Sequence, residues 1–189
     1  MNIIDHIRQH QNALVHIEQN INLVERVAAE IISTFERGNK VLVAGNGGSA
    51  ADAQHFVAEL VGRFKNERRG LPAIALTTDT SILTAVGNDY GFDEIFSRQI
   101  SALGNSGDIF IGITTSGFSR NILNSFNECK SKRIGTVCLT GNKHKGIGDI
   151  VDTAIKVNSN DTATIQELHI TIIHMLCGLV DAWVTTHEE

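Results

Sequence analysis

The hydrophobic residues of this chain follow two alternating patterns, one typical of buried strands and one typical of helices. Short apolar runs of strand length lie at 41–44, 71–76, 108–113, 134–139 and 150–157. Between them, apolar residues return every three or four positions, as they do on one face of a helix. Strands that alternate with helices in this way form a parallel sheet with right-handed crossovers and helices on both faces. The pattern therefore predicts a doubly wound α/β fold with a five-stranded parallel sheet.

Two helices are expected before the first strand, at 2–20 and 21–37. The second is the clearer one, because Val24, Val27 and Ile31 fall on one face and Gly38 with Asn39 gives a stop signal. A small sheet does not need two extra helices to cover it, so we expect both to pack against other subunits. The remaining helices are predicted from Ser49 onward and at 81–86, 92–102, 121–130 and 162–185.

Length and charge set limits on the class of protein. The chain has 189 residues, enough for a single domain, which we divide into amino-terminal helices at 1–37 and an α/β core with its last helix at 40–185. The net charge of −5 argues against a nucleic acid or an anionic membrane as partner. No span or targeting signal is evident, and three cysteines without C-x-x-C spacing fit reduced thiols in the cytoplasm. The basic cluster at 65–69 and the residues Lys143, His144 and Lys145 are expected to face solvent.

The most informative stretch is 41–62, which reads as a strand, a glycine turn and a helix. Gly45, Gly47 and Gly48 end the strand, and Ser49 is expected to cap the helix, with Asp52 adding negative charge to its first turn. Glycines let a ligand approach the backbone, and a helix start presents unpaired N–H groups. Such a turn binds anions, most often phosphate.

The spacing Gly45-x-Gly47-x-x-Ala50 also fits a loose dinucleotide fingerprint. That class of site needs an acidic residue about 20 positions further on to hold the ribose. Here the next apolar run ends at Asp79, about 30 residues past the glycine turn instead of about 20. His55 and Glu59 lie between the turn and Asp79, on one face of the helix. A dinucleotide fold has no need for them, so no nucleotide cofactor is expected.

A second strand–loop–helix follows at 108–130, and its loop at 114–119 is rich in hydroxyls. Hydroxyls and backbone amides at a helix start suit a phosphate group, although a single Ser or Thr there is also an ordinary cap. On the last helix, the helical period places Gln166, Ile170, His174, Cys177 and Asp181 on one stripe. Glu167 and His169 compete with them, because the sequence does not decide which face meets a site; a buried histidine bonded within the core is the plain alternative.

These motifs resemble the sugar isomerase (SIS) domain, and more narrowly the bacterial phosphoheptose isomerases. The matching stretches run in order from about 40 to 183: 45–49, 52–56, Glu59, 87–89, 115–117 and 165–167. The resemblance implies a flavodoxin-like sheet and a homotetramer with sites at subunit interfaces. It also implies an aldose–ketose isomerase that converts sedoheptulose 7-phosphate to D-glycero-D-manno-heptose 7-phosphate through an enediol, the first step of ADP-heptose synthesis. A non-catalytic sugar-phosphate-binding regulator of the same fold is the alternative.

The resemblance also assigns residues. Glu59 and His174 would be the acid/base pair that such a proton transfer requires. A zinc ion would be held by His55, Glu59, Gln166 and His174, ligand types that suit Zn²⁺. The phosphate and the sugar would be bound by residues of both loops and their surroundings, namely Asn46, Gly47, Ser49, Asp52, Arg63, Asn88, Asp89, Thr114, Thr115, Ser116, Ser119 and Gln166. Thr114, Phe118 and Thr164 depart from the family pattern, which usually has Ser, a polar residue and Arg there.

Overall fold

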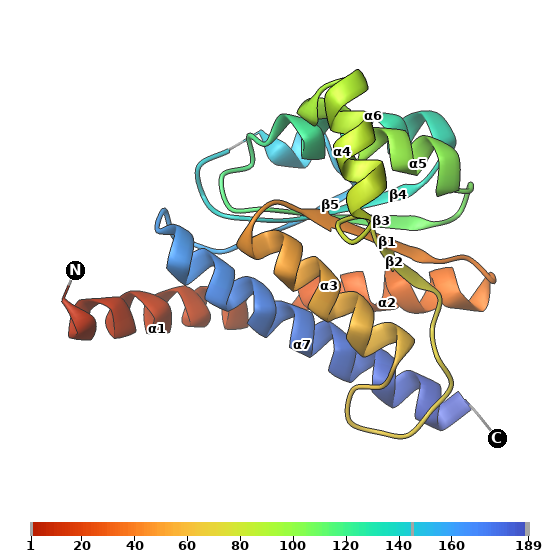
Figure 1. The fold of residues 1–189 in the computed structure, drawn as a ribbon. Helices are drawn as coiled ribbons and strands as arrows, with labels where there is room; N and C mark the ends of the chain where they lie inside the picture. Colours follow the sequence, from red (N-terminus) through yellow and green to blue (C-terminus); the bar gives the residue numbers. More distant parts are fainter. Residues whose placement is uncertain (1, 145, 188–189) are drawn as a thin grey trace.

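A computed structural model describes residues 2–144 and 146–187. Its centre is one parallel sheet of five strands in the order β2-β1-β3-β4-β5 (Figure 1). This is the strand order of flavodoxin-like doubly wound folds, so the predicted fold class is confirmed. The strands are β1 (Val41–Gly45), β2 (Ala73–Ala75), β3 (Ile109–Thr114), β4 (Gly135–Thr140) and β5 (Thr153–Lys156).

The helices form two layers, one on each face of the sheet (Figure 1). The lower layer consists of α1 (Ile3–Gln19), α2 (Ile21–Glu36), α3 (Gly48–Val61) and α7 (Thr162–His187). The upper layer consists of α4 (Thr80–Asp89), α5 (Ser97–Leu103) and α6 (Arg120–Lys132). Successive strand residues point to opposite faces of the sheet, so each face has its own hydrophobic core. Val41 and Val43 of β1 pack with the lower layer, and Leu42 and Ala44 pack with the upper layer.

The premise that neither amino-terminal helix is needed to cover the sheet is wrong for α2. Val24, Val27 and Ile31 of α2 are buried in this chain's own lower core, where α2 packs against α7 and the sheet. The long α7 does not cover the lower face alone, and α2 completes it. On α1, by contrast, Ile3 is 74% exposed and Ile7 is 47% exposed. The expectation of subunit contacts stays a prediction for both helices.

Several boundaries differ from the predicted ones. The second strand is only Ala73–Ala75, because Pro72 before it offers no N–H and uses only its carbonyl, which accepts from Val41. The fifth strand is shorter than 150–157, since a 3-10 turn, η2 (Ile147–Asp149), leads into it. The helix expected at 81–86 runs from Thr80 to Asp89, and Asp79 caps it by accepting from Ile82 N at 2.9 Å. The helix expected at 92–102 is split into η1 (Phe92–Glu94) and α5.

The predicted burial of the last helix is confirmed. Ile165, Leu168 and Ile172 of α7 are fully buried in the lower core. Within the described residues, α7 is the one helix long and apolar enough to cross a membrane, yet half of its most apolar window is buried inside the protein. That is how the core helix of a layered fold behaves. The three cysteines are also buried and unpaired, as expected.

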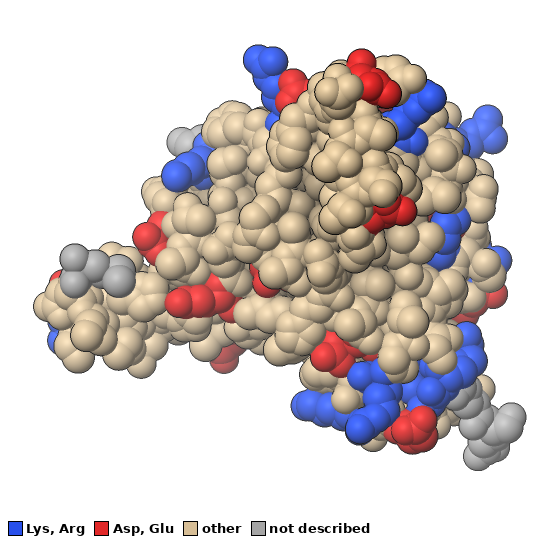
Figure 2. Space-filling model, in the orientation of Figure 1, with Lys and Arg blue, Asp and Glu red and all other residues tan. Residues whose placement is uncertain are grey.

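The solvent-facing loops are only partly as predicted. Lys65 and Arg69 are exposed, and Figure 2 shows Lys and Arg side chains gathered over the loop that follows α3. The side chain of Arg68, however, is 1% exposed, so the prediction of a fully solvated cluster is wrong there. Lys143 is exposed, whereas His144 is half-buried with its ring centroid 4.6 Å from that of Phe118. Lys145 lies outside the described residues.

Candidate active site

The glycine turn lies where the two central strands end. Gly45 of β1 is paired with Ile113 of β3, so the loop after β1 and the loop after β3 meet at the carboxyl edge of the sheet. In such sheets ligands bind at this edge, where the strand order reverses. The helix α3 begins at Gly48, and Gly47 takes the cap position with φ of +56°, a conformation that favours glycine.

The prediction that Ser49 caps this helix is wrong. Ser49 lies inside the first turn, where it is buried and its N–H donates to the Asn46 carbonyl at 3.0 Å. Asp52 therefore falls in the second turn rather than the first. The helix start carries no side-chain cap. No side chain therefore competes with an anion for this helix start, and the phosphate site stays a prediction without the serine cap.

The hydroxyl-rich loop after β3 is held together by its own side chains. The Thr114 Oγ1 lies 3.0 Å from the Ser119 Oγ, and it also accepts from Gly117 N at 3.2 Å. The Ser116 Oγ accepts from Phe118 N at 3.1 Å. Ser119 stands at the cap position of α6 but makes no side-chain capping bond. The Ser119 hydroxyl therefore does not act as an ordinary helix cap, and the start of α6 has no side-chain cap.

An amide pair that the sequence analysis missed joins the two loops. Asn46 Nδ2 donates to Asn121 Oδ1 at 2.9 Å, and Asn121 Nδ2 donates back to Asn46 Oδ1 at 2.9 Å. Asn121 is only 2% exposed. A single Asn in the first turn of a helix carries no sequence signal of such a role. The reciprocal pair fixes the glycine turn relative to the hydroxyl loop.

The structure brings three of the predicted active-site side chains together between α3 and α7. His55 Nε2 lies 3.2 Å from Glu59 Oε1, one turn along the same helix face. The ring of His174 makes an edge contact with His55 at a centroid distance of 5.1 Å. Phe64 stacks on the other side of His174 at 5.7 Å. A carboxylate and two imidazoles thus share one small region between α3 and α7.

Gln166 lies against the glycine turn. A methyl group at Gly48 would come within 2.6 Å of Gln166 Nε2, so glycine at this position makes room for that amide. The side chain of Gln166 is half-buried. The sequence left open which face of α7 meets a site, and the structure places Gln166 at the glycine turn and His174 at His55. Their roles stay predictions.

The competing candidates on α7 have other surroundings. Both carboxylate oxygens of Glu167 contact α1, with His6 Nε2 at 3.2 Å and His10 Nδ1 at 3.1 Å. His169 is fully buried, and burial lowers its pKa to about 4. The core histidine considered as the plain alternative is thus His169, and His174 is exposed.

Other predicted binding residues lie at the periphery. Arg63 is largely exposed and pairs with Glu67 at 3.7 Å. Asn88 and Asp89 are exposed at the end of α4, where Asn88 Nδ2 donates to Asp89 Oδ1 at 2.9 Å. Asp52 is half-buried, and burial raises the pKa of its carboxyl group. The interactions of these four residues do not join them to Glu59 or His174, so their roles stay predictions.

The metal prediction has the right donors but no preformed cage. Among residues 2–144 and 146–187, no group of three His, Cys, Asp or Glu side chains is arranged to hold a metal ion. His55 and Glu59 instead contact each other. The imidazole, carboxylate and amide groups are of the types that suit Zn²⁺. His55, Glu59 and His174 lie near one another, whereas the Gln166 amide lies against the glycine turn.

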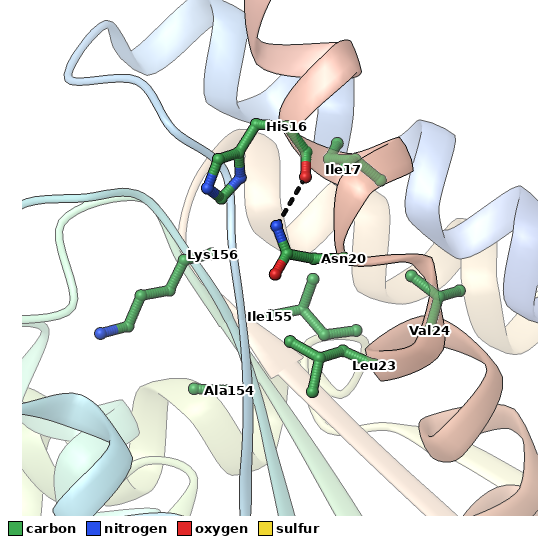
Figure 3. A pocket seen from close by; sticks show the side chains of 8 residues that line it. All are labelled: His16, Ile17, Asn20, Leu23, Val24, Ala154, Ile155 and Lys156. Atoms are coloured by element: carbon green, nitrogen blue, oxygen red, sulfur yellow. Dashed lines mark hydrogen bonds between the residues drawn. The ribbon is translucent and has the colours of Figure 1, made fainter.

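Two of the hollows on the lower layer bear on the location of the site. One is a groove of about 720 Å³ between α2 and α7, lined by His174, Phe64, Met175 and Leu179 among others, so the outer side of His174 is open. The other is a cavity of about 160 Å³ between the α1–α2 bend and β5 (Figure 3). There Asn20 Nδ2 donates to the His16 carbonyl at 2.9 Å. None of the predicted site residues lines this smaller cavity, which separates it from the proposed chemistry.

Comparison with known proteins defines the class. Residues 5–141 match the model of the SIS domain, and the chain belongs to that family. The fold, with its carboxyl-edge loops, is that of this sugar-isomerase domain.

The most similar proteins narrow the class further. The chain is 52% identical over 182 residues to the phosphoheptose isomerase of Geobacter metallireducens, covering 95% of both chains. It is 50% identical over 184 residues to that of Aneurinibacillus thermoaerophilus, covering 94% of this chain and 93% of the relative. A solved structure of phosphoheptose isomerase from Neisseria gonorrhoeae superimposes with a TM-score of 0.86 at 40% identity, covering 95% and 94%.

Proposed function

We propose that this protein is a phosphoheptose isomerase that converts sedoheptulose 7-phosphate to D-glycero-D-manno-heptose 7-phosphate, the first step of ADP-heptose synthesis. The observation that carries the proposal is the group of Glu59, His55 and His174 between α3 and α7, in a fold whose glycine turn and hydroxyl-rich loop lead into helix starts without side-chain caps. The identity of about half the residues with named isomerases over nearly the whole chain supports it.

The reaction moves one proton between neighbouring carbons. A base removes a proton from C1 of the ketose while the C2 carbonyl oxygen gains one, giving a 1,2-enediol. Protonation of C2 and loss of the proton on O1 then give the aldose. Glu59 and His174 are the two groups that carry these protons, since a carboxylate and an imidazole serve as acid and base near neutral pH. The phosphate is held by backbone amides and hydroxyls of the two loops, including Thr114, Ser116 and Ser119.

A regulator that binds the sugar phosphate without turnover is the alternative. Both members of the acid/base pair are present, and both contact His55, Glu59 with its carboxylate and His174 with its ring. This arrangement favours the enzyme over the regulator. Cytoplasmic localisation goes with this proposal, because the three cysteines are unpaired and buried.

The same residues supply a zinc site in this proposal. His55, Glu59, Gln166 and His174 would hold the ion after His55 and Glu59 exchange their mutual contact for the metal. Bound zinc would polarise the carbonyl and orient the sugar hydroxyls. Elemental analysis of the purified protein tests this: about one zinc per chain is expected, with loss in His55→Ala, and a metal-free active protein would refute it.

A homotetramer with sites at subunit interfaces belongs to the same proposal. Its support is the exposed apolar surface of α1, including Ile3, Ile4 and Ile7, and the open groove beside His174. Light scattering on the purified protein should give about four times the chain mass of 20.5 kDa. A monomer that is fully active would contradict it.

The decisive experiment is turnover of sedoheptulose 7-phosphate in deuterated water, with and without a chelator. Conversion with deuterium at C2 of the product is the expected result and identifies the enediol route. Conversion without deuterium would point to transfer shielded from solvent or to a hydride shift. Binding without conversion would support the regulator instead.

A further inference from the structure

A buried arginine lies directly behind the proposed acid/base pair. Arg68 belongs to the loop between α3 and β2, whose neighbouring basic residues are exposed, yet its side chain is 1% exposed. Its partner Asp181 on α7 is 2% exposed, with Arg68 Nε 3.0 Å from Asp181 Oδ1. Burying an ion pair costs free energy unless the remaining donors and acceptors are also satisfied.

Here the remaining donors go to backbone carbonyls, two of them at the end of α3. Arg68 Nη2 donates to the Glu59 carbonyl at 2.6 Å, and Nη1 donates to the Leu60 carbonyl at 3.0 Å. Nη1 also lies within reach of the Arg69 carbonyl at 2.8 Å and the Gly62 carbonyl at 3.4 Å. The Glu59 and Leu60 carbonyls belong to the last turn of the helix, where no intrahelical partner is available. The planar guanidinium thus caps α3 at the residue that carries the proposed base.

The acceptors of Asp181 hold the loop in turn. Asp181 Oδ2 accepts from Asn66 N at 3.0 Å and from Lys65 N at 3.4 Å. The preceding residue, Phe64, stacks on His174. One carboxylate on α7 therefore anchors both the guanidinium that fixes the backbone of Glu59 and the segment whose aromatic ring rests on His174.

We infer that Arg68 and Asp181 are positioning residues that set Glu59 and His174 in register with each other. This inference rests on the proposed function, since it gives a task to the same two groups. Arg68 touches only the backbone of Glu59, so it acts on the chemistry through geometry and not by contact with substrate. The two helices α3 and α7 meet here, and the pair is a buried ionic link between them.

Two conservative variants test the inference. Arg68→Lys keeps the charge but loses the branched, planar guanidinium, which reaches Asp181 and the α3 carbonyls of Glu59 and Leu60 at once. We expect kcat to fall about 100-fold, the size of effect that a misplacement near 1 Å has. KM and the affinity for inorganic phosphate should change less than about 2-fold, because the phosphate loops are untouched. Asp181→Asn should behave in the same way.

A double variant separates positioning from stability. Replacing a buried ion pair by apolar side chains often restores stability. We therefore expect Arg68→Met with Asp181→Leu to melt near the parent temperature while kcat stays about 100-fold low. Recovery of kcat together with stability would overturn the inference. So would an Arg68→Lys protein with parental kcat, a result that stands whether or not the double variant folds.

The matched control is a second largely buried ion pair, Lys40 with Asp108, which stands just before the amino ends of β1 and β3. Lys40→Met with Asp108→Leu should change melting but leave kcat intact. Glu59→Gln, assayed alongside, keeps the two hypotheses apart. If Glu59→Gln stays active, the proposed chemistry fails; if it is inactive while Arg68→Lys is normal, only the positioning role fails.

Discussion

The two helical layers differ in how their buried polar groups are satisfied. In the upper layer, Gln99, Asn121 and Ser125 all have hydrogen-bond partners within the chain. Within the described residues, the buried side-chain atoms without such a partner lie on α1, α3 and α7, and at Thr140 at the end of β4. They include Thr164, where the family usually has Arg. The upper layer is complete within one chain. The lower layer has polar atoms that water, a ligand, a metal or a second chain can pair, although the Thr140 backbone also reaches His169.

The comparison teaches where function is placed in this fold. The upper layer provides an apolar support and contributes the first turn of α6 to the site, together with the predicted binding residues Asn88 and Asp89 at the end of α4. The lower layer holds the acid/base pair, the buried ion pair behind it and an exposed apolar helix. Local departures from good packing mark functional regions, because such regions trade stability for chemistry.

The largest effect is expected on the lower layer, from Glu59→Gln. Losing an acid/base group costs about 10²- to 10⁴-fold in rate, so turnover should be nearly abolished while melting and phosphate binding are retained. Glu94→Gln is the upper-layer control, because Glu94 only bonds Ser97 and Asn124. It should leave kcat unchanged. Near-normal activity of Glu59→Gln would refute its acid/base role.

Gly48→Ala tests the contact between the glycine turn and α7. The new methyl group must displace the flexible end of Gln166, which costs little stability but moves a proposed ligand. We expect kcat/KM to fall about 100-fold with a melting temperature no lower than the parent's. Gly148→Ala is the control, because nothing lies within 4 Å of its added carbon. Equal activity of both variants would remove Gln166 from the site.

His169 makes the stability of the lower layer depend on pH. Its folded-state pKa is about 4, against 6.5 for the ordinary side chain, because burial disfavours the charged form. Between these values the unfolded chain binds more protons, so stability is lost as the pH falls from 6.5 toward 4. From pH 7 to 5 the free energy of unfolding should drop by about 2 kcal/mol on this account. Denaturant titrations of His169→Gln should lack this slope, whereas the exposed His187→Gln should retain it.

The smallest effect is expected from the hydroxyl-rich loop at the start of α6. Ser119→Ala and Thr114→Ala each remove a hydroxyl from the loop at the start of α6. We expect KM to rise about 10-fold with little change in kcat, the loss of roughly one hydrogen bond to a charged group. Ser131→Ala, at the exposed far end of α6, should have no effect. A fall in kcat instead of a rise in KM would mean that the loop acts in the transition state.

The sequence predicted what depends on local patterns. The five strands, their parallel arrangement and the buried face of α7 followed from apolar spacing. Glu59 and His55 could be paired because one turn of a helix sets their separation. Gly47 was identified as part of a turn, and its positive φ agrees with this role.

What depends on long-range contacts could not be predicted. Arg68 looked like one more surface cation, because its burial depends on an ion pair with Asp181, which lies far along the chain. Asn121 gave no signal, since its amide matters only opposite Asn46. The choice between His169 and His174 required the orientation of α7. The expected cap at Ser49 was wrong because Gly47, two residues earlier, takes the cap position of α3.

The place of α7 in the chain bears on how the protein is made. This helix follows every other element, yet it covers the sheet face that includes Val43, Ile111 and Leu139. During synthesis that face is covered only in part, by the lower-layer helices that precede α7, until α7 has left the ribosome. The nascent chain therefore exposes an apolar surface after its upper layer has been made. Such a surface is prone to aggregation until the last helix covers it.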